Sequence, residues 1–139
     1  MSFTQESARL TDGGVLAMQS AAIEAASSMG QPQCIVIVDP SGVVLSSFRM
    51  SGSRFLSLKS ALAKARTAAS INGPSASIPE HARLLLAGAT QGAVTGLKGG
   101  LPIRIKGILV GAIGVGSGSG EQDEEVAKAA LAAIGAETV

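Results

Sequence analysis

The sequence contains no tryptophan, no tyrosine and only three phenylalanines among its 139 residues. A chain with so few aromatic rings offers little surface on which nucleobases could stack, which argues against single-stranded nucleic-acid binding. Because 46% of the residues are nonetheless hydrophobic, the core has to be built from alanine, valine, isoleucine, leucine and methionine. Such a core favours helices that pack close to a sheet.

Excess charge and long apolar runs are also absent. The formal net charge is +1, and the basic residues form no run, so neither duplex DNA nor an anionic membrane is an expected partner. No apolar stretch approaches the roughly 20 residues that a transmembrane helix needs. The N-terminal residues lack the basic and then apolar pattern of a secretory signal, so we expect a cytoplasmic protein.

Cysteine and histidine occur once each. Cys34 excludes an internal disulfide, and its place in the apolar run CIVIV predicts a buried, inert thiol. One histidine and one buried cysteine argue against a tetrahedral zinc site. No Ser-His-Asp set or nucleophile elbow can be assembled. The sequence therefore assigns no catalytic residues.

Glycine is abundant, above all between residues 99 and 120. This stretch predicts a strand over 103–106, a tight turn, a second strand over 108–115 and a helix from Ser119, which forms a capping box with Gln122. Glycine weakens a strand interior, so the glycines of the second strand indicate that another backbone or a ligand lies close to the sheet. The following Gly/Ser loop resembles a phosphate cradle. However, acidic residues fill the first turn of the helix, which favours a flexible connection or a subunit contact.

The rest of the chain predicts a single domain over residues 1–139. We expect helices over 11–29, 53–70 and 79–87, strands over 34–38 and 43–50, and one short strand within 88–100. The hairpin connections predict a mainly antiparallel sheet with helices packed on it. The helix over 53–70 has an apolar stripe, expected to be buried: Phe55, Leu58, Leu62, Ala65 and Ala69.

The same helix carries a polar stripe of Ser57, Ser60, Lys64 and Thr67. Small hydroxyls beside one lysine suit a ligand carboxylate, whereas the alternative is a lysine whose stem covers apolar surface. We expect Lys64 to line a pocket between this helix and the sheet or a neighbouring subunit. Loss of its charge should then change stability by less than about 1 kcal/mol, as for a pair that is not buried.

Two further side chains are candidates for ligand binding. Arg49, at a strand end, could hold a carboxylate or pair with Asp39 or Glu24. His81, near the start of a short helix, could ligate haem or a metal, serve as a base, or lie exposed on the surface. The candidate ligand-binding residues are Lys64, Ser60, Thr67, Arg49 and His81.

Several motifs resemble signatures of the GlcG/HbpS family: VDPSGVVLSSFRM, SLKSALAKARTA, GGLPI and GAIGVGSGSGEQDEEVAKAAL. The resemblance covers residues 10–135 and implies a profilin-like α/β fold, with a five-stranded, mainly antiparallel sheet flanked by helices. It also implies self-assembly into dimers or larger rings, and haem or another tetrapyrrole as ligand. In one branch of the family a histidine of the first helix ligates haem, whereas residues 11–29 here contain no histidine.

Three functional hypotheses follow. The first is a small-ligand-binding homo-oligomer whose ligand is haem, another tetrapyrrole or a carboxylated metabolite. The second is a cofactor-free lyase or isomerase of a catabolic operon that uses Lys64 with Arg49. The third is a structural accessory subunit without a ligand.

Overall fold

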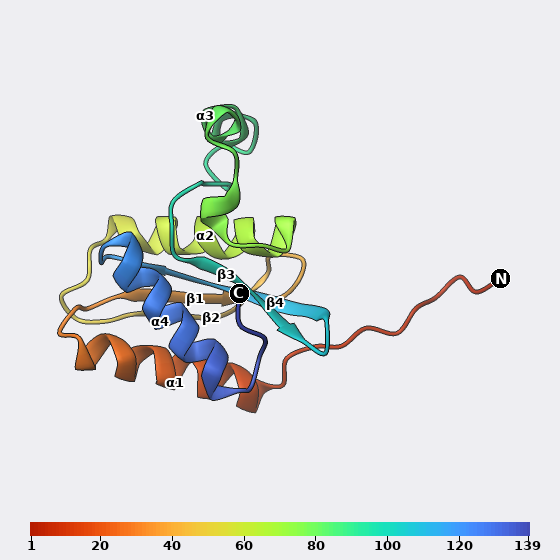
Figure 1. The fold of residues 1–139 in the computed structure, drawn as a ribbon, viewed down its shortest axis with the longest axis horizontal. Helices are drawn as coiled ribbons and strands as arrows, with labels where there is room; N and C mark the ends of the chain where they lie inside the picture. Colours follow the sequence, from red (N-terminus) through yellow and green to blue (C-terminus); the bar gives the residue numbers. More distant parts are fainter.

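The computed structural model describes all 139 residues and forms an antiparallel sheet with helices on both faces (Figure 1). The elements, in chain order, are α1 (Asp12–Ser28), β1 (Cys34–Val38), β2 (Val44–Arg49), α2 (Leu56–Ile71), a short 3₁₀ turn η1 (Ser75–Ser77), α3 (Glu80–Ala89), β3 (Gly100–Ile105), β4 (Ile108–Gly116) and α4 (Gly120–Ala133). The predicted capping box of Ser119 and Gln122 at α4 is confirmed, and the side chain of Thr11, at the predicted start of the first helix, accepts a hydrogen bond as the N-cap of α1.

The sheet has four strands in the order β2-β1-β4-β3, so the prediction of five strands is wrong. Residues 88–99, which were expected to hold most of the extra strand, form the end of α3 and a loop before β3, and Gly100 begins β3. In this loop the N–H groups of Val94, Thr95 and Leu97 donate to the hydroxyls of Thr90, Thr67 and Thr95. Side chains and not a neighbouring strand therefore satisfy these backbone groups. The likeness to profilin stays a prediction.

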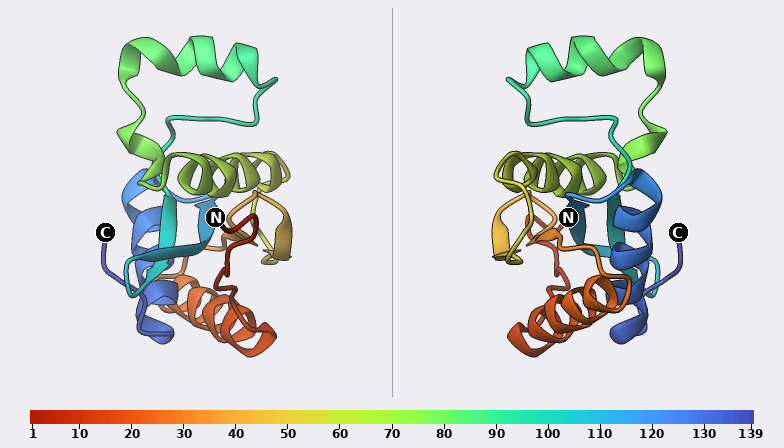
Figure 2. Two further views of the ribbon diagram at one scale, coloured as in Figure 1. Left: turned by 90° about the vertical axis from the view of Figure 1, so that its right-hand side faces the viewer. Right: turned by 90° about the vertical axis from the view of Figure 1, so that its left-hand side faces the viewer.

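Two apolar layers enclose the sheet. α1 and α4 pack on one face, and α2 covers the other (Figures 1 and 2). The α1/α4 layer contains the larger side chains, including Met18, Ile35, Ile113 and Leu131. The α2 layer is built largely from alanines of α2 packed on the inward-facing residues of β1, with Cys34 buried among them as predicted.

The buried face of α2 agrees with the predicted stripe only in part. Ala65 and Ala69 of that stripe are buried, but Phe55, just before the helix, is 81% exposed, and Ala61, outside the stripe, is fully buried. A Cβ atom at Gly114 of β4 would overlap the carbonyl oxygen of Ala61. The helix backbone therefore lies directly against the strand, and only alanine fits between them. This close approach confirms that the strand glycines make room for another backbone.

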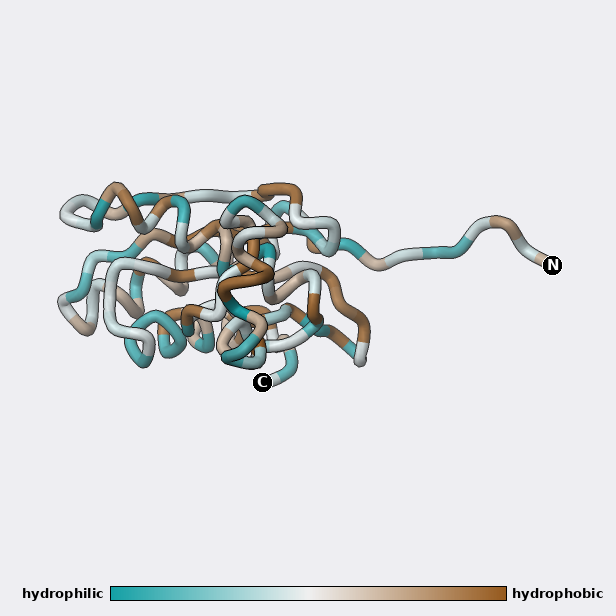
Figure 3. Tube along the Cα trace, turned by 90° about the horizontal axis from the view of Figure 1, so that it is seen from above, coloured by the Kyte–Doolittle hydropathy of each residue, from teal (hydrophilic) through white to brown (hydrophobic).

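The remaining parts of the chain lie at the periphery. α3 stands away from the sheet beyond α2, in both views of Figure 2, and contains no buried residue. The exposed N-terminal segment, residues 1–9, runs out from the body (Figure 3). No helix in the structure combines the length and the apolar character needed to cross a membrane.

Candidate functional site

A buried ion pair connects α2 to α4. Lys64 Nζ lies 2.8 Å from Asp123 Oδ2 and donates a second hydrogen bond, also 2.8 Å, to the carbonyl oxygen of Val115. The other carboxylate oxygen of Asp123 accepts the N–H of Gly118 at 3.0 Å. Lys64 is 4% exposed and Asp123 is 2% exposed. The pair therefore ties α2, β4 and the loop before α4 together.

This geometry changes the role expected for Lys64. Its ammonium group faces a carboxylate inside the protein, so its charge is already neutralised. The expectation that loss of this charge would cost less than about 1 kcal/mol assumed a pair that is not buried, and that assumption is wrong. Removal of one partner of a buried pair leaves the other charge buried without a partner, which lowers the free energy of unfolding.

A pocket of about 220 Å³ lies over the ion pair, which forms part of its wall. We call it the α2–α4 pocket. Its lining residues are Arg54, Leu56, Ser57, Ser60, Lys64, Leu97, Lys98, Ser117, Gly118, Gly120 and Asp123. The start of α2, the loop before α4 and the end of the loop before β3 thus meet here. Lys64 forms part of a pocket wall, as the polar stripe predicted, but the pocket lies between α2 and these two loops and not between the helix and the sheet.

The electrostatics of the α2–α4 pocket favour an anion. Arg54 is exposed, and its side chain makes no hydrogen bond or ion pair within the chain. Lys98 has only a loose pair, with 3.8 Å between its Nζ and Glu121 Oε1. α2 begins without a side-chain cap and without an acidic residue in its first turn. The positive end of the α2 dipole and two available cations therefore face this pocket.

The start of α4 has a different character. Its first turn contains Glu121 and Asp123, and the capping box of Ser119 and Gln122 satisfies its N–H groups. The Gly/Ser loop is therefore a wall of the pocket and not itself a phosphate cradle.

The other predicted site residues lie outside this pocket. Thr67 is buried, donates to the carbonyl oxygen of Ala63 and accepts from Thr95. Arg49 donates to the carbonyl oxygen of Ser53, and not to either of the carboxylates considered as its partners. His81 lies exposed at the start of α3. Only Lys64 and Ser60, of the five candidates, come together.

Sequence reasoning missed Arg54, Lys98 and Asp123. Carboxylates along a C-terminal helix are ordinarily explained as a solvated face, but Asp123 is buried. Its place in a family signature that begins with the strand glycines was the available signal. Arg54 and Lys98 carry no comparable signal, because each is an isolated surface cation in the sequence.

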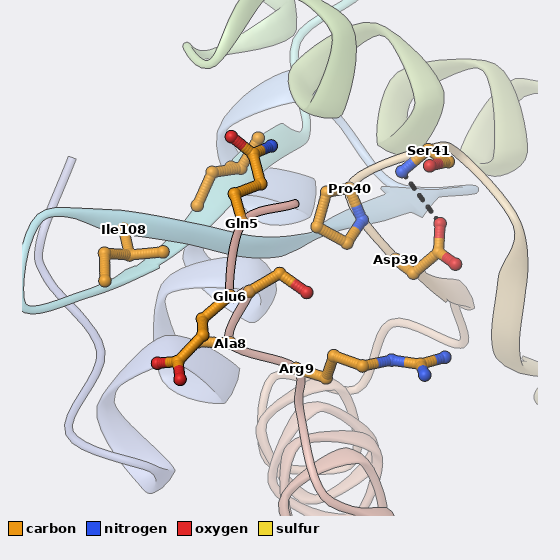
Figure 4. Close-up of a pocket in the computed structure, with 10 residues that line it drawn as sticks. Gln5, Glu6, Ala8, Arg9, Asp39, Pro40, Ser41 and Ile108 are labelled. Atoms are coloured by element: carbon orange, nitrogen blue, oxygen red, sulfur yellow. Dashed lines mark hydrogen bonds between the residues drawn. The ribbon is translucent and has the colours of Figure 1, made fainter. Parts of the chain in front are cut away.

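A larger cavity of about 510 Å³ lies between the N-terminal segment, the β1–β2 turn and the start of β4 (Figure 4). Asp39, one of its two acidic lining residues, accepts the N–H groups of Ser41 and Val43 with its Oδ1 at 2.8 and 3.0 Å. Asp39 is thus a turn residue, as its sequence context predicts. The wall formed by exposed residues 5–9 contains no buried polar group, so the α2–α4 pocket is the better candidate site.

The family model described as "Haem degrading protein HbpS-like" matches residues 10–132. The chain belongs to this HbpS-like family. It is 34% identical, over 119 residues, to the corrinoid adenosyltransferase PduO of Salmonella typhimurium. That alignment covers 82% of the chain but 35% of the relative, so the chain spans about a third of the length of the curated relatives it matches.

Two solved structures are similar to the whole fold. The Klebsiella pneumoniae protein ORFY has a TM-score of 0.92 and 26% identity, with 99% of each chain covered. The PduOC:heme complex has a TM-score of 0.88 and 29% identity, with 94% of this chain and 99% of the other covered.

Haem is the group that these relatives suggest, and the residues present do not fit it. Haem iron is held by histidine, cysteine, methionine or tyrosine side chains. The chain has no tyrosine, its one histidine is exposed on α3, and Cys34 is fully buried. Neither the α2–α4 pocket nor the larger cavity is lined by histidine, cysteine or methionine. The structure contains no group of three or more histidine, cysteine, aspartate or glutamate side chains that could hold a metal ion.

Proposed function

We propose that this chain is a small-ligand-binding protein whose α2–α4 pocket takes the carboxylate of a small organic acid. The observation that carries the proposal is the open start of α2, with Arg54 and Lys98 beside it and the serines of α2 lining the same space. N–H groups at a helix start and nearby cations bind anions. The haem complex of PduOC supports a ligand-binding role for this fold in general.

Some of the lining residues bind the ligand, and others keep the pocket rigid. In this proposal Arg54 and Lys98 contact the carboxylate, and the hydroxyls of Ser57 and Ser60 donate to it. The Lys64–Asp123 pair holds the helix and the loop in register. A pocket of about 220 Å³ lies below the roughly 300–1,000 Å³ typical of sites for drug-sized ligands, which favours a ligand of a few carbon atoms.

Isothermal titration calorimetry with pyruvate, succinate and citrate tests the proposal. We expect Arg54→Gln and Lys98→Gln each to weaken the best of these by about tenfold, or about 1.4 kcal/mol. Lys106→Gln is the matched control, because Lys106 is an exposed cation in the β3–β4 turn and far from the pocket lining. Absence of binding of all three acids, or equal affinities in all variants, contradicts the proposal.

The lyase or isomerase hypothesis finds less support. It uses Lys64 as the base, yet the Lys64 ammonium is already bound to Asp123 and Val115. Its proposed partner Arg49 belongs to β2 and does not line the pocket.

A cytoplasmic homo-oligomer remains part of the proposal. The exposed leucines of α3 support its assembly.

A further inference from the structure

The charged side chains around the α2–α4 pocket leave one positive charge uncompensated. Lys64 and Asp123 neutralise each other inside the protein. Lys98 is paired loosely with Glu121 of α4, whereas Arg54 has no ion pair within the chain. The remaining charges at the pocket are therefore two cations and one carboxylate. This balance matches a ligand with a single negative charge.

Two exposed leucines line the same pocket. Leu56 is the first residue of α2, and Leu97 lies in the loop before β3. They are 64% and 57% exposed, and neither belongs to the apolar layers that enclose the sheet. Aliphatic carbons of a ligand would be removed from water on these side chains, which is favourable. A second charged group on the ligand would instead lose hydration there without gaining a partner.

We propose that the ligand of the α2–α4 pocket is a monocarboxylate with a short aliphatic chain, and that Glu121 makes the pocket select against dicarboxylates. This class of acid refines the proposed function, on which it rests. The carboxylate lies between Arg54 and Lys98. The chain contacts Leu56 and Leu97, and the volume of about 220 Å³ limits it to a few carbon atoms.

Glu121 acts through Lys98 and not by contact with the ligand. Its side chain is exposed and does not line the pocket, but its Oε1 lies 3.8 Å from Lys98 Nζ. It therefore neutralises the positive charge that a second ligand carboxylate would need. That second carboxylate would also be repelled by the like charge of Glu121. Glu121 is thus a specificity-determining residue that touches no ligand atom.

Chemical-shift titrations of isotope-labelled protein with butyrate and succinate test this selectivity. The two acids have carbon chains of equal length and differ at one end, where a methyl group stands in place of a carboxylate. At constant ionic strength we expect the wild type to bind butyrate about tenfold more tightly, because the methyl group is buried favourably and the second carboxylate has no partner. Succinate binding as tightly as butyrate overturns this inference and leaves the proposed function intact. Absence of binding of butyrate, succinate and pyruvate overturns both.

Glu121→Gln tests the origin of the selectivity. Lys98 is then free to pair with a second carboxylate, so the ratio of butyrate to succinate affinity should fall about three- to fivefold, as for an exposed ion pair. A general disturbance of the pocket would weaken both acids alike and leave the ratio constant. Glu125→Gln is the matched control, because Glu125 is exposed on the same helix, has no ion pair and does not line the pocket. An unchanged ratio in Glu121→Gln, or an equal change in both variants, overturns the role of Glu121.

Acetate and butyrate test the contact between the chain and the leucines. Leu56→Ala and Leu97→Ala should each weaken butyrate about threefold and leave acetate unchanged, because only butyrate reaches these side chains with its extra methylene groups. Leu16→Ala is the control, since Leu16 is exposed on α1 and does not line the pocket. All three leucines are exposed, so the variants should fold, and their amide spectra check this. Equal affinities for acetate and butyrate in the wild type, or butyrate binding unaffected by both leucine variants, overturns the contact with the chain.

Discussion

At the scale of single residues, Lys64 shows how burial changes the meaning of a motif. The polar stripe of α2 marks it as a ligand-binding cation, and it does line the pocket. Its charge, however, is bound to Asp123, 59 positions later in the chain. The cations of the pocket that are not held by a close ion pair are Arg54 and Lys98, which stand alone in the sequence. A side chain at the site can therefore have a structural role while its neighbours carry the binding.

Lys64→Met should lower the free energy of unfolding by about 3–5 kcal/mol, because it leaves Asp123 charged and buried without its partner. Urea denaturation measures this change. Lys128→Met is the control, since the Lys128–Glu124 pair on the surface of α4 should be worth less than about 1 kcal/mol. Equal effects of the two substitutions would mean that the buried pair contributes no more than an exposed one.

His81 is the single residue that could serve haem as an axial histidine, and it lies exposed on α3. We expect His81→Ala to leave any haem affinity within about tenfold of the wild type, or about 1.4 kcal/mol, in a titration of the Soret band. A sharp low-spin band that disappears in this variant would identify His81 as the ligand and reverse our conclusion about haem.

At the scale of elements, the contact between α2 and β4 decides the packing of half the molecule. Large side chains usually form the buried stripe of a helix, yet here the alanines are buried and Leu58 and Leu62 lie at the flanks. The reason is the strand, since Gly114 lets the helix backbone approach until a leucine no longer fits. Periodicity alone cannot reveal which face of α2 is buried, because it contains no information on the distance to the opposing backbone.

Gly114→Ala should therefore destabilise the protein by several kcal/mol, in the upper range of point substitutions, because the added methyl group meets backbone atoms of Ala61 and Ala65. Gly13→Ala in the first turn of α1 is the control. Its new methyl group meets only Thr11 Oγ1 at 3.9 Å, so the higher helix propensity of alanine should stabilise by up to about 1 kcal/mol. Thermal and urea unfolding of both variants provide the comparison, and a neutral Gly114→Ala would refute the close approach.

At the scale of the whole molecule, the proposed self-association through the exposed leucines of α3 links stability to protein concentration. Association of folded chains stabilises them by mass action, so the melting temperature should rise as the wild type is concentrated from 1 to 100 µM. Leu85→Glu should remove this dependence, whereas Ile108→Glu should keep it. Differential scanning fluorimetry follows both variants, and a melting temperature independent of concentration in the wild type would exclude self-association as a source of stability.

The sequence by itself determined what depends on neighbours along the chain. The caps at Thr11 and Ser119, the buried run of β1 and the β3–β4 hairpin were all predictable, because hydrogen bonds over three or four residues and strand alternation specify them. The glycines of β4 also predicted that another group lies close to the sheet, but they did not identify α2 as that group.

Only the tertiary structure decided the rest. The segment expected to form the fifth strand is a loop whose N–H groups at Val94, Thr95 and Leu97 donate to threonine hydroxyls, one of them Thr67 of α2. The buried face of α2 was set by the strand beneath it, and the Lys64–Asp123 pair joins residues that the sequence keeps far apart. Each of these outcomes depends on contacts between distant segments, whose energies a local pattern does not contain.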